Sequence, residues 1–266
     1  MYGQNPQNNA ALRSNAEPSL IFRTETEYGL CLVMGFNCHK LEIPESCKPL
    51  LHRDEISFAA GFSDVRRMTW LAGRHVLRQA LGERGWCGDA VLLSDQRGAP
   101  LAPPDFSVSL SHKVKGDEVF AAELVCEEPI GRIGVDIELA DNPRPSIAEL
   151  VLTPGEVALA KMLPVEERWH RTLVHFSLKE ALYKAVDPFV NRDIDYGEAE
   201  VFPCSNGKVQ VHLNFSEAAE MNLSAEAQCL FVNGMIISMA RTVAVCAGRR
   251  MVTETVSPSE PISFSE

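Results

Sequence analysis

Apolar side chains recur at helical spacing along residues 64–81. The apolar positions of this segment are Val65, Met68, Ala72, Val76 and Ala80. Residues three and four apart share one face of a helix, so the spacing predicts an amphipathic helix whose arginines lie off the apolar stripe. Gly82 follows the last apolar position, and glycine commonly stands just after a helix, so we expect this helix to end there.

The same spacing in residues 169–186 predicts a second long helix. Its apolar positions include Leu173, Phe176, Ala181 and Leu182. Pro188 has no main-chain N–H to donate, so we expect it to terminate this helix. Shorter helices are expected before the long ones. One begins within residues 54–60, and one is opened by the TPGE segment of residues 153–156, where a cap residue is followed by proline and glutamate.

Short apolar runs bounded by turn residues predict strands around these helices. Asn233-Gly234 separates the last two runs and is a strong hairpin signal. The expected strands are residues 29–36, 91–94, 106–111, 119–125, 133–139, 198–202, 208–215, 230–232 and 235–245. Long helices against antiparallel strands in each half of the chain predict an α+β fold.

The order of elements predicts two α+β halves, residues 21–128 and 129–250, with the boundary in the turn of residues 127–132. No internal sequence repeat accompanies this order. Residues 1–20 are rich in Asn, Gln and Ser, and residues 251–266 in Ser, Pro and Glu. Such compositions bury little apolar surface, so we expect a disordered extension and a disordered tail.

Composition and charge narrow the class of protein. The 266 residues are 45% hydrophobic and 23% charged, as in ordinary soluble proteins, and no apolar run predicts a membrane span. A net charge of −11 argues against nucleic-acid binding, which depends on many basic contacts. The eight cysteines form no CxxC pair, which predicts reduced thiols, a cytoplasmic location and no structural zinc. Positive charge is concentrated locally, between residues 66 and 78.

Acidic and basic side chains converge in two short segments. In a strand, Asp136 and Glu138 project to one face while Val135 and Ile137 project to the other. In a helix, side chains four residues apart share a face, and the segment of residues 176–185 contains such an acid–lysine pair. Hard oxygen ligands of this kind suit Mg²⁺, which also accepts water and substrate phosphates.

Each of these groups also has a structural interpretation. Asp136 and Glu138 read alone are solvated charges at the end of an edge strand. Glu180 and Lys184 read alone are a surface helix pair that contributes a few tenths of a kcal/mol. His112 is then a core or turn histidine bonded to a carbonyl, and the arginines form a solvated helix face. Their joint occurrence in one order along the chain favours function over these separate interpretations.

Two segments carry a family resemblance. GVDIE at 134–138 and FSLKEALYKA at 176–185 resemble the paired signatures of the 4′-phosphopantetheinyl transferases, of the larger monomeric class of surfactin-synthetase activators and siderophore-pathway enzymes. SVSLSHKVKG at 107–116 is similar to the serine-histidine strand end of that family. RGAP at 97–100 resembles its basic turn, and VRRMTWLAGR at 65–74 its arginine helix.

The resemblance covers roughly residues 60–190 and implies a fold and a reaction. The implied fold has two similar α+β halves related by a pseudo-twofold axis, with coenzyme A in the cleft between them. The implied activity is that of a holo-acyl-carrier-protein synthase type of transferase. It moves the 4′-phosphopantetheine arm of coenzyme A to a serine of an apo-carrier protein and releases 3′,5′-ADP. The implied metal is Mg²⁺, with Mn²⁺ as the alternative.

The resemblance also implies roles for single residues. Asp136, Glu138 and Glu180 would hold the metal, Glu180 or its water would receive the serine proton, and Lys184 would stabilise or protonate the leaving phosphate. Sequence leaves the choice between these acid and base roles open. The coenzyme A pocket would be formed by Arg66, Arg74, Arg97, Ser111, His112 and Lys179. In a regular helix Arg66 and Arg74, eight residues apart, differ by about 80° around the axis, whereas Arg67 and Arg74 differ by only about 20°. We therefore expect Arg67 to share the role given to Arg66.

Two other functions stay open beside transfer: a non-enzymatic module that binds coenzyme A or a nucleotide, and a Mg²⁺-dependent phosphohydrolase. The expected partners are coenzyme A and an apo-carrier protein of the acyl, peptidyl or aryl carrier class, from polyketide, nonribosomal-peptide, siderophore or fatty-acid synthesis. Sequence does not choose among these carriers. A duplicated enzyme needs no second chain to build its cleft, so we expect a monomer.

Overall fold

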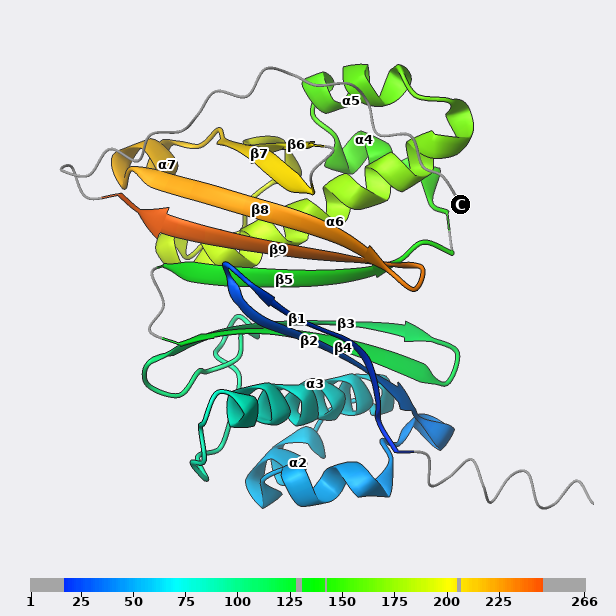
Figure 1. The fold of residues 1–266 in the computed structure, drawn as a ribbon, viewed down its shortest axis with the longest axis vertical. Coiled ribbons are helices and arrows are strands. Elements are labelled where there is room, and N and C mark those ends of the chain that lie inside the picture. Colours follow the sequence, from blue (N-terminus) through cyan, green and yellow to red (C-terminus); the bar gives the residue numbers. More distant parts are fainter. Residues whose placement is uncertain (1–16, 128–130, 142, 205–206, 246–266) are drawn as a thin grey trace, which may run out of the picture. The chain divides into compact units, whose positions relative to one another are not determined.

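The computed structural model describes residues 17–127, 131–141, 143–204 and 207–245. The chain divides into two compact units, Met1–Glu128 and Pro129–Glu266. Each unit combines helices with an antiparallel sheet (Figure 1), so the α+β class predicted from sequence is confirmed.

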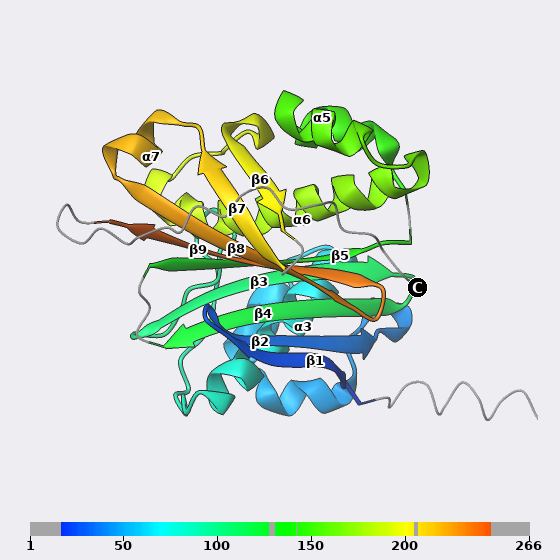
Figure 2. The same cartoon turned by 45° about the horizontal axis from the view of Figure 1, so that its top comes forward.

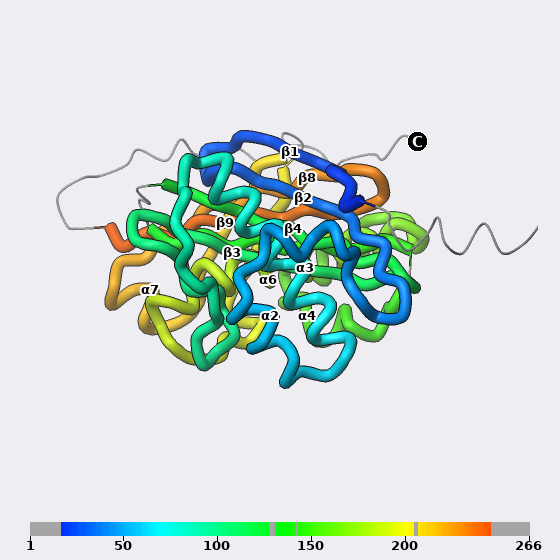
Figure 3. Tube along the Cα trace, turned by 90° about the horizontal axis from the view of Figure 1, so that it is seen from below, coloured from blue at the N-terminus to red at the C-terminus, as the bar shows by residue number. Residues whose placement is uncertain are grey.

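In the first unit, a long helix covers one face of an antiparallel sheet. The strands lie in the order β1-β2-β4-β3 (Figure 2), and α3 packs against β2, β3 and β4. The short helix α2 lies beside α3 (Figure 3). The elements are β1 (Ser19–Thr26), β2 (Gly29–Asn37), η1 (His39–Leu41), η2 (Glu45–Leu50), α2 (Arg53–Ala59), α3 (Asp64–Glu83), β3 (Phe106–Lys115) and β4 (Glu118–Glu127).

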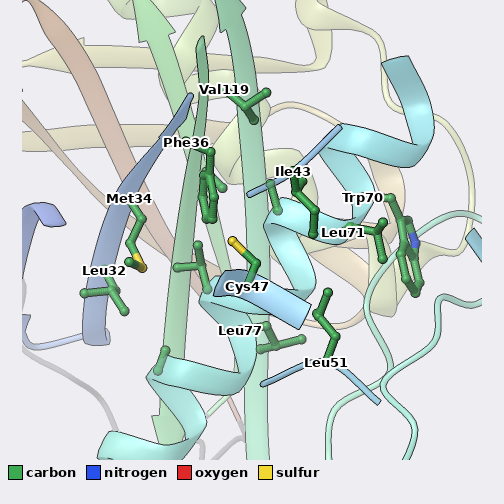
Figure 4. Packing of buried hydrophobic residues seen from close by; sticks show 14 of the residues in the cluster. Leu32, Met34, Phe36, Ile43, Cys47, Leu51, Trp70, Leu71, Leu77 and Val119 are labelled. Carbon is green, nitrogen blue, oxygen red and sulfur yellow. The ribbon is translucent and has the colours of Figure 1, made fainter. Parts of the chain in front are cut away.

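The core of the first unit forms between β2 and α3. Leu32, Met34 and Phe36 alternate along β2 and meet Leu71 and Leu77 of α3 (Figure 4), and all five are buried. Burying one such side chain contributes about 1.5–3 kcal/mol. The strand period of two and the helix period of 3.6 thus bring their apolar faces together, and this packing fixes where the polar side of α3 lies.

In the second unit, the longest helix packs on a sheet with the order β5-β9-β8-β7-β6. Helix α6 lies against β5 and β9, with α4 and α5 beside it (Figure 1). The elements are β5 (Arg132–Leu139), η3 (Pro145–Ile147), α4 (Ala148–Val151), α5 (Pro154–Lys161), α6 (Val165–Val190), η4 (Tyr196–Glu198), β6 (Ala199–Pro203), β7 (Lys208–Leu213), α7 (Ser216–Glu220), β8 (Leu223–Val232) and β9 (Met235–Ala244). The predicted Asn233-Gly234 hairpin is confirmed, because it joins β8 to β9 with φ values of 51° and 75°.

Both units contain the same sheet pattern. In the first, a strand (β2), a helical segment and two further strands (β3, β4) give the order β2-β4-β3. In the second, β5, a helical segment and finally β8 and β9 give the order β5-β9-β8. All of these neighbours are antiparallel. The halves are therefore similar in topology, although the sequence shows no repeat.

The structure corrects both predicted helix ends. Helix α3 continues through Gly82 to Glu83, and the residue in the left-handed conformation is Gly85, with φ of 78°. The N–H of Trp86 donates to the carbonyl of Leu81 at 3.0 Å, which closes the helix beyond the predicted glycine. Helix α6 continues through Pro188 to Val190 and ends at Asn191, which adopts the left-handed conformation with φ of 50°.

The structure also corrects some strand predictions. Residues 91–94 form no strand and contribute one isolated bridge, Ser94 to Pro100. Strand β1 was not predicted and begins at Ser19, so the expected disordered extension 1–20 is wrong for its last two residues. Residues 1–16 of that extension and the whole expected tail 251–266 lie outside the described residues.

Candidate functional site

Gly134 sets the distance between β5 and α6. A Cβ at this position would lie 1.9 Å from the carbonyl oxygen of Ala181, so only glycine allows the helix to approach this closely. Because alternate residues of a strand share a face, Asp136 and Glu138 project to the same side as Gly134, toward α6. The close approach therefore places two carboxylates against the helix that carries Glu180 and Lys184.

Lys184 compensates part of the buried negative charge on β5. Asp136 is 3% exposed and Glu138 is 4% exposed, and burial of ionised carboxylates is costly unless cations or donors compensate it. The ammonium of Lys184 donates to Asp136 Oδ1 at 3.1 Å and to the carbonyl oxygen of Val135 at 2.8 Å. The predicted proximity of Asp136 to Lys184 is therefore present in the structure.

Glu180 lies one turn before Lys184 and accepts a hydrogen bond from the hydroxyl of Tyr196, at the start of η4. Burial raises the pKa of the Tyr196 phenol, and so do the hydrogen bond to Glu180 and the charges of Glu180, Asp136 and Glu138. All three predicted metal ligands thus act on one hydroxyl group. They form one acidic site on β5 and α6.

The donor set of this site fits a hard divalent cation. It offers three carboxylates against the single ammonium of Lys184, so the local charge is negative and the ligand atoms are oxygens. The three carboxylates converge only in part, however. Across the described ranges, no three carboxylate, imidazole or thiol side chains are placed to share one ion. Lys184 and Tyr196 instead each engage a carboxylate oxygen, on Asp136 and Glu180 respectively.

Lys179 lies next to Glu180 but is fully buried. Its ammonium donates to Glu156 Oε2 at 2.7 Å and to the carbonyls of Val151 and Tyr196, both at 2.8 Å. Burial lowers the pKa of Lys179, opposed by Glu156. Burial alone would raise the pKa of the Glu156 carboxyl, but the imidazole of His175 at 3.3 Å and hydrogen bonds from Lys179 and the main chain bring it down to about 2. Lys179 is thus engaged inside the protein, not directed at solvent.

Arg74 is similarly engaged within the first unit. It is fully buried, and its guanidinium donates to the carbonyls of Leu92 at 2.5 Å and Leu93 at 3.2 Å and to the hydroxyl of Ser94 at 2.7 Å. It also stacks 4.3 Å from the ring of Trp70. Burial lowers the pKa of Arg74 to about 10. These contacts give Arg74 a structural role that its sequence position did not reveal.

The other predicted coenzyme A ligands of the first unit are more accessible. Arg66 is exposed, 5.8 Å from the ring of Phe62, and Arg67 is half-buried and paired with Asp64 at 2.8 Å. Arg97 is exposed in a turn where its N–H donates to Asp95. Two further predicted ligands are neighbours on β3: Ser111, buried, and His112, half-buried.

The structure therefore brings together Asp136, Glu138, Glu180 and Lys184 and gives Arg74 and Lys179 buried partners. Sequence reasoning missed Tyr196, which no local pattern marks. It also missed the role of Gly134, although a glycine inside a strand is a signal of close approach by another backbone.

Two family models match the chain. The 4′-phosphopantetheinyl transferase superfamily model matches residues 132–240, and the 4′-phosphopantetheinyl transferase N-terminal domain model matches residues 55–121. Together they cover more than half of the 266 residues and include both signature segments. The chain belongs to the 4′-phosphopantetheinyl transferases, in their larger class, as its sequence motifs predicted.

Solved structures of holo-acyl-carrier-protein synthases are similar to part of the chain. The Helicobacter pylori enzyme in complex with coenzyme A is 19% identical with a TM-score of 0.34, over 41% of this chain and 98% of that one. The Plasmodium yoelii enzyme is 22% identical with a TM-score of 0.36, over 44% and 96%. A comparison with curated protein sequences gave no match. Each helix in the described part of the chain is too short or too polar to cross a lipid bilayer.

Proposed function

We propose that this protein transfers the 4′-phosphopantetheine arm of coenzyme A to a serine of an apo-carrier protein. The observation that carries the proposal is the acidic site on β5 and α6. There Glu180 accepts a hydrogen bond from Tyr196, Lys184 pairs with Asp136, and the charges of Asp136, Glu138 and Glu180 all raise the pKa of Tyr196. This site lies inside the segment that matches the transferase superfamily.

The reaction replaces the phosphoanhydride bond of coenzyme A with a phosphoester bond to the carrier serine. The serine oxygen of the carrier attacks the β-phosphorus of coenzyme A, the bond from that phosphorus to the bridging oxygen breaks, and 3′,5′-ADP leaves with the bridging oxygen. A Mg²⁺ ion held by the three carboxylates would supply Lewis-acid stabilisation of the pyrophosphate charge. Glu180, or a water that it orients, accepts the serine proton.

Lys184 supports the leaving group in this proposal. Its ammonium lies 3.1 Å from Asp136 and its side chain is 31% exposed, so it is held at the site and still reaches solvent. A cation in this position stabilises the departing phosphate oxygen and is able to return a proton to it. The roles of Glu180 as base and Lys184 as acid are our assignment between the two alternatives that sequence left open.

Coenzyme A binding is assigned to accessible basic groups of the first unit. Arg66 is exposed, and arginine matches phosphate through two parallel hydrogen bonds, so we assign it the adenosine phosphates, with Arg67 beside it. Arg97 and His112 complete the pocket in the proposal, with Ser111. Arg74 and Lys179 contribute indirectly, by keeping their surroundings in place. The location of coenzyme A between the two halves stays a prediction.

The proposal is tested by incubating the protein with coenzyme A, Mg²⁺ and a panel of apo-carrier proteins, followed by intact mass measurement. Transfer adds one phosphopantetheine group to a carrier and requires its acceptor serine. EDTA should abolish the gain. If no carrier gains mass while coenzyme A raises the melting temperature in EDTA, the protein is a coenzyme A binding module. Release of free phosphopantetheine without a carrier would indicate a phosphohydrolase.

The carrier class, the dependence on Mg²⁺ or Mn²⁺, the cytoplasmic location and the monomeric state belong to the proposal. The panel should therefore contain acyl, peptidyl and aryl carriers, and the mass of the native protein should be measured in the same buffer. A dimer would contradict the expected monomer without affecting the assignment of the reaction.

A further inference from the structure

Tyr196 is held on three sides by described residues of the second unit. Its ring packs against those of Phe176 and Tyr183, with centroids 5.8 Å and 5.5 Å away. Its carbonyl accepts a hydrogen bond from Lys179 at 2.8 Å. Its hydroxyl donates to Glu180 Oε1. Because Lys179 and Glu180 are successive residues of α6, one short stretch of helix holds both ends of the tyrosine.

Lys179 is itself anchored by a buried acid. Glu156, fully buried at the third position of α5, accepts from Lys179, from the N–H of Thr153 and from the N–H of Val201, which joins α5, α6 and β6. A buried ammonium with three oxygen partners is fully satisfied, so it has no donor left for a phosphate. Its contacts fix the start of η4 relative to α6.

The first unit contains a matching arrangement. Glu55, also fully buried at the third position of a short helix, accepts from Arg78 of the long helix at 2.6 Å and from the N–H of Leu92 at 2.8 Å. The acid and the base are 23 residues apart in both units. The first unit has such a pair without the carboxylate site. We therefore infer that the Glu156–Lys179 pair supports the fold and does not itself bind coenzyme A.

We propose that Tyr196 is a positioning residue for Glu180 and that Lys179 acts on the reaction through Tyr196, not as a coenzyme A ligand. The inference rests on the proposed transfer. Hydrogen bonds to a ligating carboxylate orient it and commonly change metal affinity or activity by about 10–100-fold. In this proposal the Tyr196 hydroxyl engages one oxygen of Glu180 and leaves the other oxygen to the metal ion.

The first experiment compares Tyr196→Phe with Tyr183→Phe. Both changes remove one hydroxyl and keep the ring, but the Tyr183 hydroxyl donates to the carbonyl of Asp195 at 3.0 Å, not to a carboxylate of the site. Binding of Mn²⁺ alone is followed by electron paramagnetic resonance, and transfer kinetics are measured on the same samples. For Tyr196→Phe we expect Mn²⁺ binding about ten-fold weaker, a lower kcat and an unchanged KM for coenzyme A. Tyr183→Phe should match the parent protein.

The second experiment tests Lys179 with the double variant Lys179→Met/Glu156→Gln, which removes both charges and avoids an unpaired buried carboxylate. The folded state is checked by near-ultraviolet circular dichroism. We expect weaker Mn²⁺ binding with an unchanged dissociation constant for coenzyme A measured in EDTA. Weaker coenzyme A binding in a folded variant would restore Lys179 as a ligand and overturn the inference.

The outcomes separate this inference from the proposed function. If the parent protein modifies no carrier but binds Mn²⁺, and Tyr196→Phe weakens that binding, the transfer proposal fails and the positioning role stands. If transfer occurs and Tyr196→Phe leaves both Mn²⁺ binding and kcat unchanged, Tyr196 has no positioning role. Tighter Mn²⁺ binding by Tyr196→Phe would mean that the hydroxyl obstructs the ion, which also overturns the inference.

Discussion

At the residue scale, Asp136 combines burial with a single identified ammonium partner, and this makes it the most informative carboxylate to change. Asp136→Asn keeps the shape of the side chain and removes its charge. Lys184 reaches solvent and is able to turn away from the neutral amide. We therefore expect the fold to persist and the rate of transfer to fall by about a hundred-fold or more, measured by intact mass of the carrier.

The matched control for Asp136→Asn is Glu226→Gln. Glu226 pairs with Arg241 at 2.8 Å and its side chain is 42% exposed, so the loss of this surface pair should change stability by less than about 1 kcal/mol. Transfer should be unchanged. Equal rates for Asp136→Asn and Glu226→Gln would remove Asp136 from the reaction.

Arg74 and Arg66 should respond differently to alanine, although both were expected from sequence to bind coenzyme A. Arg74→Ala leaves the carbonyls of Leu92 and Leu93 without their buried donor, which costs about 1–3 kcal/mol of unfolding free energy in urea. Arg66→Ala removes an exposed side chain, so it should leave stability unchanged and raise the KM for coenzyme A. A stable Arg74→Ala protein with a raised KM would return Arg74 to the ligand set.

Single residues also show which features of the site could be predicted from the sequence and which could not. The grouping of Asp136, Glu138, Glu180 and Lys184 was predictable, because strand and helix periods fix which side chains share a face. The engagement of Arg74 was not, because its partners include main-chain carbonyls 18 and 19 residues away that no side-chain pattern encodes.

At the element scale, the contact of α6 with β5 depends on Gly134. Gly134→Ala would place a Cβ within 1.9 Å of the Ala181 carbonyl, so the helix must shift and with it Glu180 and Lys184. We expect a loss of stability of about 1–3 kcal/mol or more and a loss of transfer. Gly82→Ala is the control. That position in α3 has no atom within 4 Å of a new Cβ, so alanine should stabilise the helix by up to about 1 kcal/mol.

Both changes are measured by urea unfolding of the same preparation. If Gly134→Ala keeps its stability and its activity, the close approach of α6 does not constrain the site. If Gly82→Ala is destabilising, the C-terminal turn of α3 does not accept an added Cβ, although no neighbouring atom obstructs it.

The packing of α5 on α6 should depend on pH through Glu156. Its pKa is about 2 in the folded protein, below the ordinary 4.5 of an unfolded chain, so the charged form stabilises the fold above about pH 4.5. That contribution is lost as the pH falls from about 4.5 through about 2. Denaturant unfolding at several pH values should show stability decreasing over this window. Glu156→Gln should show a shallower decrease, and equal slopes would contradict the assignment.

Elements were predictable where a period was long and regular. Residues 64–81 and 169–186 were recognised as helices for this reason, and the Asn-Gly pair fixed the last hairpin. Their ends were not predictable, because Gly85 and Asn191 provide the left-handed caps while Gly82 and Pro188 are more conspicuous in the sequence. Strand β1 was missed because its apolar positions are few and half-exposed.

At the scale of the whole molecule, both units repeat one topology and one buried acid–base pair, but only the second carries the acidic site. Its Glu180 and Lys184 follow Lys179 by one and five residues. The corresponding positions after Arg78 in the first unit are Gln79 and Glu83, and Glu83 pairs with Arg23. This similarity is not visible in the sequence, because the residues that match are a Glu–Arg pair in one unit and a Glu–Lys pair in the other.

A chain of net charge −11 that concentrates carboxylates at one site should be stabilised by the cation it binds. A ligand present at a hundred times its dissociation constant stabilises a folded protein by about 2.7 kcal/mol, so Mg²⁺ should raise the melting temperature by about 5 °C. EDTA should reverse the rise without unfolding the chain, since the core of each unit is held by apolar side chains. Asp136→Asn should abolish the shift and Glu226→Gln should retain it. A shift of equal size in both variants would locate the cation elsewhere on the acidic surface.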